Sequence, residues 1–411
     1  MAIVKPFKGI RPCKDIADRI AALPYDVYNR AEAKREVQRE PLSFLRIDRA
    51  ETQFEDTMDM YDEQVYQRAH DILWDMVGNG DFVTEAQECY YIYELSMNGR
   101  VQDGIVACAS VDDYLGNVIK KHENTREEKE QDRIRHVDTC SAQTGPIYLA
   151  YRAKKEIQKV IANKKTELPL YDFTSNDGIR HRVFCIDNPE QIEVISKAFN
   201  DCNEIYIADG HHRAASAVKV GLKRRAENPD YNGNEEFNYF LSVLFADEQL
   251  MIMDYNRVVK DLNGYTAEDL ISKVRELFET EEDDSIDHYP KHKGEFCMYI
   301  SGKWYRCNVR EEDKIKHPVA GLDVSILQEK LLRPVLGIED PRIDKRIDFV
   351  GGIRGLGELE KRVATDCKVA FAMYPTSIQE LFDVADAGML MPPKSTWFEP
   401  KLRSGLFIHQ I

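Results

Sequence analysis

A strand, a glycine turn and a helix follow one another at residues 204–220, and this succession limits the fold more than any other feature of the chain. Residues 204–208 form a short apolar run typical of a strand, and the small residues from 214 to 220 are typical of a helix. The turn between them consists of Asp209, Gly210, His211, His212 and Arg213. A strand that passes through glycine into a helix exposes backbone N–H groups and the positive end of the helix dipole, which favour an anion. The sequence therefore predicts a phosphate site at this turn.

The side chains of the turn fit the same interpretation. Arg213 offers a fixed fork of donors suited to phosphate oxygens. Asp209, at the end of the strand, is placed to hold Mg²⁺ or a substrate hydroxyl. The alternative is purely structural: Asp-Gly is a common turn, and His211-His212 is then either a metal pair or an accident of the surface.

The composition indicates a globular protein with a strongly acidic surface. Hydrophobic residues make up 43% of the chain and charged residues 31%, and the net charge of −16 repels nucleic acid and anionic membranes. No apolar run reaches the ~20 residues of a membrane span, and the N-terminus has no apolar signal segment. The nine cysteines are scattered without a C-x-x-C pair, which argues against zinc ribbons and thioredoxin-type chemistry. We therefore expect a reduced, cytoplasmic protein without membrane or nucleic-acid partners, and the oligomeric state stays open.

Alternating and helical patterns predict a mixed α/β (α+β) fold. Two hairpins are expected: residues 90–95 with 105–110 through Asn98-Gly99, and residues 296–300 with 304–309 through Ser301-Gly302. Helices are expected at 54–78, 126–136, 190–199, 265–280, 323–336, 356–364 and 376–387. Further strands are expected at 143–151, 181–186, 368–374 and 405–410, with two neighbouring strands at 238–245 and 250–255. The acidic run 281–284 is expected to be a solvated loop. A doubly wound Rossmann sheet is not supported, because no G-x-G-x-x-G motif is present.

A second candidate site is the polar loop around His122 and Glu123. A glutamate beside a histidine can act as a general base, and the loop lacks the second histidine of the H-E-x-x-H zinc motif. The alternative is an exposed charged loop. Lys129 and Arg133 follow at i and i+4 on one helix face, where they are either phosphate ligands or a solvated ion-pair face.

The C-terminal segment offers a third candidate. Lys394, Ser395 and Thr396 supply a cation and two hydroxyls after two prolines, so they could line a substrate pocket. The alternative is a packed terminal loop. The chain contains no P-loop, no G-x-S-x-G elbow and no protein-kinase catalytic loop, so any phosphate chemistry uses another scaffold.

Nearly the whole chain resembles the bacterial and archaeal family catalogued as domain of unknown function 1015, which carries a ParB-like (SpoOJ) description. The matching motifs run in order through Arg11-Pro12, residues 24–27, His122 to Thr125, Lys129 with Asp132-Arg133, residues 208–213, 322–327, 348–351 and 391–396, Pro400-Lys401 and Ser404-Gly405.

The His-Glu loop and the Asp-Gly-His-His-Arg turn also resemble, more weakly, the free serine kinases of the ParB/sulfiredoxin superfamily. That resemblance implies a ParB/sulfiredoxin-like core with Glu123 as general base, His122 beside it and Asp209 assisting with a metal or a hydroxyl. It also implies a phosphate site and ATP or ADP as donor with Mg²⁺. The phosphate ligands would then be Gly210, His211, His212 and Arg213.

Together these observations favour a nucleotide-dependent kinase of a small hydroxyl metabolite, with free L-serine as the expected acceptor and O-phosphoserine as the product. One alternative is a ParB-like regulatory protein that binds a nucleotide without catalysis; its DNA-binding version conflicts with the charge of −16. The other is a metal-dependent phosphohydrolase built on His211 and His212. We expect three domains: an N-terminal α/β segment (1–115), a nucleotide-binding core (116–260) and a C-terminal α/β domain (261–411).

Overall fold

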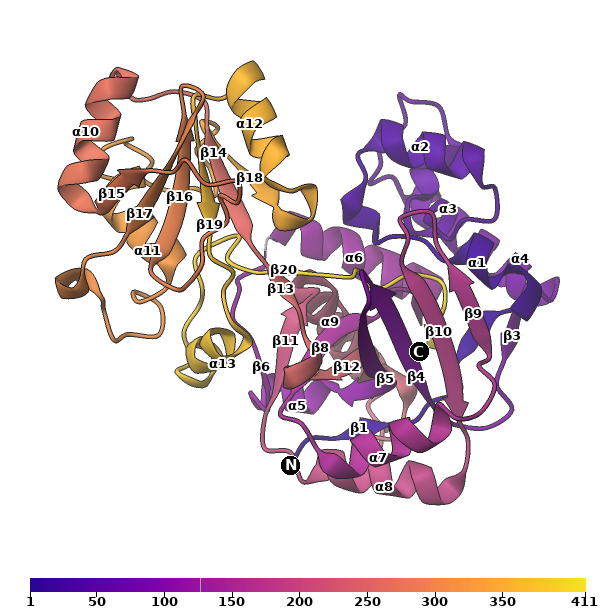
Figure 1. Ribbon diagram of the computed structural model, residues 1–411. Coiled ribbons are helices and arrows are strands. Elements are labelled where there is room, and N and C mark those ends of the chain that lie inside the picture. Colours follow the sequence, from indigo (N-terminus) through magenta and orange to yellow (C-terminus); the bar gives the residue numbers. More distant parts are fainter. Residues whose placement is uncertain (126) are drawn as a thin grey trace. The chain divides into compact units, whose positions relative to one another are not determined.

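The computed structural model describes residues 1–125 and 127–411, and these form two compact units (Figure 1). The first unit contains residues 1–250 and 400–411, and the second contains residues 251–399. The chain therefore leaves the first unit once and returns to it for its last twelve residues. Both units combine helices with sheets, which confirms the mixed α/β class.

The first unit is built on a nine-stranded sheet that mixes parallel and antiparallel pairs. In spatial order its strands are β6 (Ile119–Lys120), β11 (Ile205–Asp209), β8 (Ile147–Tyr151), β12 (Tyr239–Ala246), β5 (Arg100–Ser110), β4 (Tyr90–Met97), β10 (Arg180–Ile186) and β9 (Tyr171–Thr174), and β1 (Val4–Lys5) pairs with β5. Only β6 with β11 and β8 with β12 are parallel. The expected border after residue 115 does not separate compact units, because β4 and β5 pair with β10 and β12 beyond it.

The β4–β5 hairpin forms where the sequence predicts it. Asn98 and Gly99 have φ values of 51° and 79°, the positive values that a two-residue turn of the I′ type requires. Register then brings alternate residues of neighbouring strands onto one buried face. Ile105 lies opposite Leu244, which lies opposite Leu149, and all three are fully buried.

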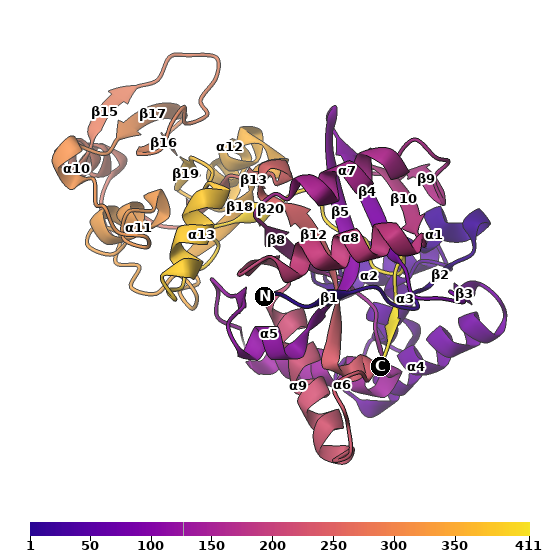
Figure 2. The ribbon, with the colours of Figure 1, turned by 90° about the horizontal axis from the view of Figure 1, so that it is seen from below.

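Nine helices belong to the described part of the first unit: α1 (Ala17–Ile20), α2 (Arg30–Arg39), α3 (Leu45–Asp48), α4 (Glu63–Gly78), α5 (Val111–Leu115), α6 (Glu127–Cys140), α7 (Lys155–Lys164), α8 (Pro189–Asn200) and α9 (His211–Glu227). Helices α7 and α8 lie side by side against one face of the sheet (Figure 2), where Phe199 makes an edge contact with Tyr151. Helix α6 packs along α9 and α4.

Two predicted helices of this unit have different limits in the structure. The helix expected from residue 54 begins only at Glu63, because the Asp62 side chain caps it by accepting a hydrogen bond from the Gln64 amide. The charged helix continues beyond His136 to Cys140, and its expected first residue, Arg126, lies outside the described residues.

Two short pairs complete the first unit: β2 (Ile10–Pro12) with β3 (Phe82–Thr84), and β7 (Ala142–Gln143) with β21 (His409–Gln410). The last strand is thus shorter than the expected 405–410. Gly405 has a φ of 85°, which interrupts an extended strand.

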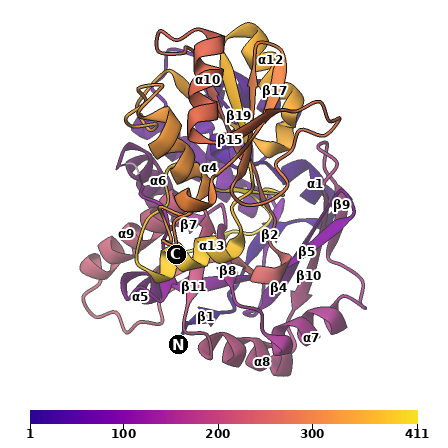
Figure 3. The same cartoon turned by 60° about the vertical axis from the view of Figure 1, so that its left-hand side comes forward.

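The second unit contains a six-stranded antiparallel sheet (Figure 3). Its order is β15 (Glu279–Glu282), β17 (Lys303–Asn308), β16 (Glu295–Ile300), β19 (Val369–Met373), β14 (Tyr255–Val259) and β18 (Ile347–Gly351). A separate pair joins β13 (Ile252–Met253) to β20 (Trp397–Phe398). The helices are α10 (Ala267–Leu277), α11 (Asp323–Leu327), α12 (Leu356–Thr365) and α13 (Ile378–Asp386). Buried Leu359 of α12 packs in one cluster with Val258 and Ala370 of the sheet.

Three predictions for the later part of the chain differ from the structure. The first half of the acidic run expected as a loop, Glu281 and Glu282, is part of β15, because β17 supplies a partner strand with Lys303 paired to Glu282, whereas Asp283 and Asp284 lie outside the strand. The strands near 238–245 and 250–255 are not neighbours, since β12 pairs with β5 and β8. The helix expected at 323–336 ends at Leu327 and continues as a π-helical turn at Gln328–Leu332. The hairpin across Ser301-Gly302 is confirmed.

Among the described residues, no helix is long and apolar enough to span a membrane.

Candidate functional site

The strand–glycine–helix turn has the conformation that the sequence predicts. Strand β11 ends at Asp209, Gly210 adopts the left-handed region with φ 91° and ψ 32°, and α9 starts at His211. A Cβ atom on residue 210 would lie 3.1 Å from Nε of Arg213. The guanidinium of Arg213 therefore lies over the glycine, which explains why this position needs a residue without a side chain.

Asp209 is held by two partners. Its Oδ1 accepts a hydrogen bond of 2.9 Å from the Gly210 amide, and its Oδ2 lies 3.1 Å from Nζ of Lys401. Partial burial raises the pKa of this carboxyl, but the charges of Lys401 and Arg213 outweigh that effect and hold the pKa well below its usual range. Lys401 was not among the predicted site residues, although it belongs to one of the family motifs.

The His122-Glu123 loop lies directly against this turn. Strand β6 runs parallel to β11, so both strands lead their following residues to the same edge of the sheet. The rings of His122 and His211 stand nearly perpendicular, with centroids 4.5 Å apart. The structure thus brings together two motifs that are far apart in the sequence.

Both histidines are buried and neutral. Burial lowers the pKa of His122 to about 4 and lowers that of His211 well below its ordinary value. Nδ1 of His122 and Nε2 of His211 are buried without a hydrogen-bond partner among the described residues. Buried polar atoms of this kind are rare and often mark functional sites.

Glu123 lies at the surface above this pair. Its Oε2 is 3.8 Å from Nδ1 of His211, and 43% of its side chain is exposed. A carboxylate that is accessible to a ligand therefore lies at the first residue of α9, where phosphate is expected to bind.

Glu130, which sequence reasoning missed, ties the loop to α9. Its carboxylate accepts a hydrogen bond from Thr125 and forms an ion pair with Lys219, and its backbone carbonyl accepts a 3.1 Å bond from Ser216 Oγ. Burial raises the pKa of Glu130, but the hydrogen bonds from Lys219 and Thr125 outweigh it and lower the pKa. The run of charged residues at the start of this helix does not predict the role of Glu130, because the pattern does not show which of its acidic side chains is buried.

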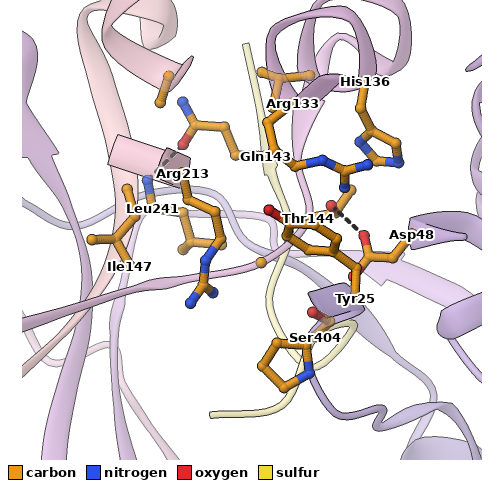
Figure 4. Close-up of a pocket in the computed structure, with 14 residues that line it drawn as sticks. Tyr25, Asp48, Arg133, His136, Gln143, Thr144, Ile147, Arg213, Leu241 and Ser404 are labelled. Atoms are coloured by element: carbon orange, nitrogen blue, oxygen red, sulfur yellow. Dashed lines mark hydrogen bonds between the residues drawn. The ribbon is translucent and has the colours of Figure 1, made fainter. Parts of the chain in front are cut away.

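On another side of α9, Arg213 and Arg133 line one small cavity of about 30 Å³ (Figure 4). Arg213 Nη1 donates to the Pro146 carbonyl at 2.5 Å. Arg133 lies 4.0 Å from the ring centre of Tyr25 and 2.8 Å from Asp132 Oδ2. The cavity lining includes neither His122 nor Glu123.

An adjoining cavity of about 200 Å³ shares Tyr25, Asp48, Arg133 and His136 with the first and adds Lys129. Lys129 is exposed whereas Arg133 is buried. The alternative of a solvated ion-pair face therefore does not hold for Arg133, which packs under Tyr25. The assignment of Lys129 and Arg133 as phosphate ligands stays a prediction.

The side chains of His211 and His212 lie in different surroundings. Consecutive residues of a helix point in different directions, and His211 is buried while His212 is partly exposed. Among the described residues, no cluster of three or more potential metal ligands includes either of them.

Lys394, Ser395 and Thr396 belong to the second unit. Ser395 Oγ donates to the Pro392 carbonyl at 2.6 Å, and the Lys394 carbonyl accepts a 3.0 Å bond from Arg257. These contacts hold the segment to its own turn and to strand β14 of the same unit. The assignment of Lys394, Ser395 and Thr396 to a substrate pocket stays a prediction.

Comparison with known proteins defines the family. The model of the family described as "Protein of unknown function (DUF1015)" matches residues 4–325, so the chain belongs to that family. A search of curated proteins found no match.

Three solved structures are similar at low identity. A free serine kinase mutant in complex with ADP is 14% identical, with 75% of this chain and 93% of that chain covered and a TM-score of 0.36. SbnI with a C-terminal truncation, from Staphylococcus aureus, is 13% identical, with coverages of 73% and 85% and a TM-score of 0.39. A conserved hypothetical protein from Pyrococcus furiosus is 16% identical, with coverages of 75% and 95% and a TM-score of 0.34.

Proposed function

We propose that this protein is a nucleotide-dependent kinase that phosphorylates the hydroxyl of a small metabolite, with free L-serine as the first acceptor to test and O-phosphoserine as its product. One observation carries the proposal: the Glu123 carboxylate lies 3.8 Å from His211 Nδ1, at the N-terminus of α9. A base and an anion-binding helix end are therefore adjacent. A ParB/sulfiredoxin-like core around this turn is part of the same proposal.

The N-terminus of α9 supports phosphate binding. The helix is 17 residues long, and its N-cap Gly210 has no side chain to cap the first turn. Arg213 uses one guanidinium nitrogen for the Pro146 carbonyl, and a guanidinium has further N–H groups to offer a phosphate. Lys401, beside Asp209, adds a second cation to the turn. These groups provide local positive charge in a chain with a net charge of −16.

Glu123 is the proposed base. In the proposed step, the acceptor hydroxyl oxygen forms a bond to the terminal phosphorus while its proton passes to the Glu123 carboxylate. The bond between that phosphorus and the bridging oxygen breaks, and its electron pair leaves with the shortened nucleotide. Because His122 and His211 are neutral, they pack under Glu123 without adding a charge that would weaken it as a base.

Asp209 fits a magnesium ion poorly. Both of its oxygens have partners, Gly210 N at 2.9 Å and Lys401 Nζ at 3.1 Å, so a directly bound ion would have to displace the lysine. We therefore assign Asp209 to positioning Lys401 and the turn. Mg²⁺ bound with the nucleotide would neutralise phosphate charge during phosphoryl transfer.

The experiment is an acceptor screen. The full-length protein is incubated with Mg²⁺, ATP or ADP, and one member of a panel of hydroxy-amino acids, and the acceptor is analysed by mass spectrometry. We expect a phosphorylated acceptor that requires protein, nucleotide and acceptor together. Nucleotide binding without product would favour the regulatory alternative, and phosphate release without an acceptor would favour the phosphohydrolase.

A further inference from the structure

Three potential metal ligands from two segments, the β3–β4 connection and strand β10, meet in the first unit. They are Glu85, Cys89 and Cys185, and one ligand atom from each lies within 4.8 Å of the other two. Cys89 is buried, whereas Cys185 and Glu85 are partly exposed. The site is therefore open on one side.

Sheet register explains why the two cysteines meet. Cys185 of β10 lies opposite Tyr91 of β4. Cys89 precedes Tyr91 by two residues, so its side chain is on the same face of the sheet. Cys89 exchanges two backbone hydrogen bonds with Phe7, and the Glu85 amide donates to the Gly9 carbonyl at 3.0 Å. These hydrogen bonds therefore fix the backbone at Glu85 and at Cys89.

The surroundings suit a negatively charged ligand set. Arg11 Nε donates to Glu85 Oε1 at 2.5 Å, which orients the carboxylate. The Tyr91 hydroxyl is buried without a hydrogen bond of ordinary geometry to another described residue.

We propose that Glu85, Cys89 and Cys185 bind one zinc ion, with a fourth position left for water or another small ligand. Thiolates and carboxylates are zinc ligands, and sulfurs ~2.3 Å from a tetrahedral zinc lie ~3.8 Å apart, within the observed limit. Binding releases the two thiol protons. Two thiolates and one carboxylate with Zn²⁺ leave a single negative charge, which Arg11 balances.

The test uses Co²⁺ as a spectroscopic substitute for zinc in the full-length protein. The protein is stripped of metal with a chelator, kept reduced and titrated without oxygen. We expect one Co²⁺ per chain, a sulfur-to-cobalt charge-transfer band, and loss of that band when zinc is added. Cys185→Ser and Glu85→Gln should each weaken Co²⁺ binding by at least roughly tenfold. Cys202→Ser, another buried cysteine of the same unit, is the matched control and should bind like the wild type.

Circular dichroism of each variant establishes that it is folded, and Glu85→Gln keeps the test valid if Cys185→Ser does not fold. Zinc should raise the melting temperature of the wild type and of Cys202→Ser but not of the two ligand variants. A reduced wild type without the charge-transfer band would overturn the proposal. So would a band that persists at full strength in folded Cys185→Ser, or a Cys89–Cys185 disulfide found by mass spectrometry after rapid alkylation of cell extracts.

Discussion

The ring of His122 stands nearly perpendicular to the ring of His211, with an interplanar angle of 89° and a centroid distance of 4.5 Å. The two residues come from the loop after β6 and from the start of α9, so this contact joins the two motifs of the candidate site. Both rings are buried and uncharged. Because this contact depends on two uncharged rings, we expect the packing of the two motifs against each other to depend on pH.

We predict that acid weakens the fold through His122. Its pKa in the folded protein is about 4, below the ~6.5 of an unfolded chain. As the pH falls between these values, the unfolded state binds the proton and the folded state does not, so stability decreases. Between about pH 7 and about pH 5, this one residue should reduce the free energy of unfolding by about 2 kcal/mol.

Chemical denaturation of the wild type and of His122→Gln at both pH values measures this effect. Glutamine keeps an N–H donor but does not titrate in this range. The variant should lose about 2 kcal/mol less than the wild type between the two pH values. Equal losses in both proteins would show that His122 is protonated in the folded state as easily as in the unfolded state.

A second prediction concerns Gly210. Alanine at this position is strained by the left-handed backbone and also approaches the Arg213 guanidinium to about 3.1 Å. Gly178 provides a matched control, because its φ of 80° imposes similar strain while a Cβ atom at that position would have no neighbour within 4 Å. Both alanine variants should lose about 1–2 kcal/mol of stability. Only Gly210→Ala should also weaken nucleotide binding, measured by calorimetry; equal nucleotide affinities in the two variants would contradict a role for the Arg213 position.

Arg213→Ala gives a third prediction. Removal of the guanidinium takes a phosphate contact from both the ground state and the transition state, so nucleotide affinity and turnover should fall together. Arg180→Ala is the control: it removes an exposed arginine of β10 that pairs with Asp172 of β9, and it should change neither nucleotide affinity nor turnover. Unchanged nucleotide affinity in a folded Arg213→Ala variant would mean that Arg213 only supports the turn through Pro146.

Local signals in the sequence predicted local structure well. Asn98-Gly99 and Ser301-Gly302 specify tight turns by themselves, and both hairpins are present. The turn at Gly210 is also set locally, because only the glycine-compatible backbone allows β11 to lead directly into α9. Elements whose identity depends on a distant partner were missed: β15 is a strand because β17 lies beside it.

The same distinction applies to the candidate site. The turn residues and the His-Glu pair could be named from composition and order. Lys401 and Glu130 could not, because their roles arise from contacts with Asp209 and Lys219 across long stretches of chain. Helical spacing placed Arg133 on one face with Lys129, but it does not reveal that Tyr25 covers Arg133.

Glu123→Gln tests the central claim most directly, through turnover and nucleotide affinity measured on the same preparation with the acceptor found in the screen. Glutamine keeps the size of the side chain but cannot accept the proton, so turnover should fall by roughly 10²–10⁴ while the nucleotide Kd changes little. Glu193→Gln, at an exposed position of α8, is the matched control and should keep wild-type turnover. Wild-type turnover in Glu123→Gln would contradict the assignment of Glu123 as the base.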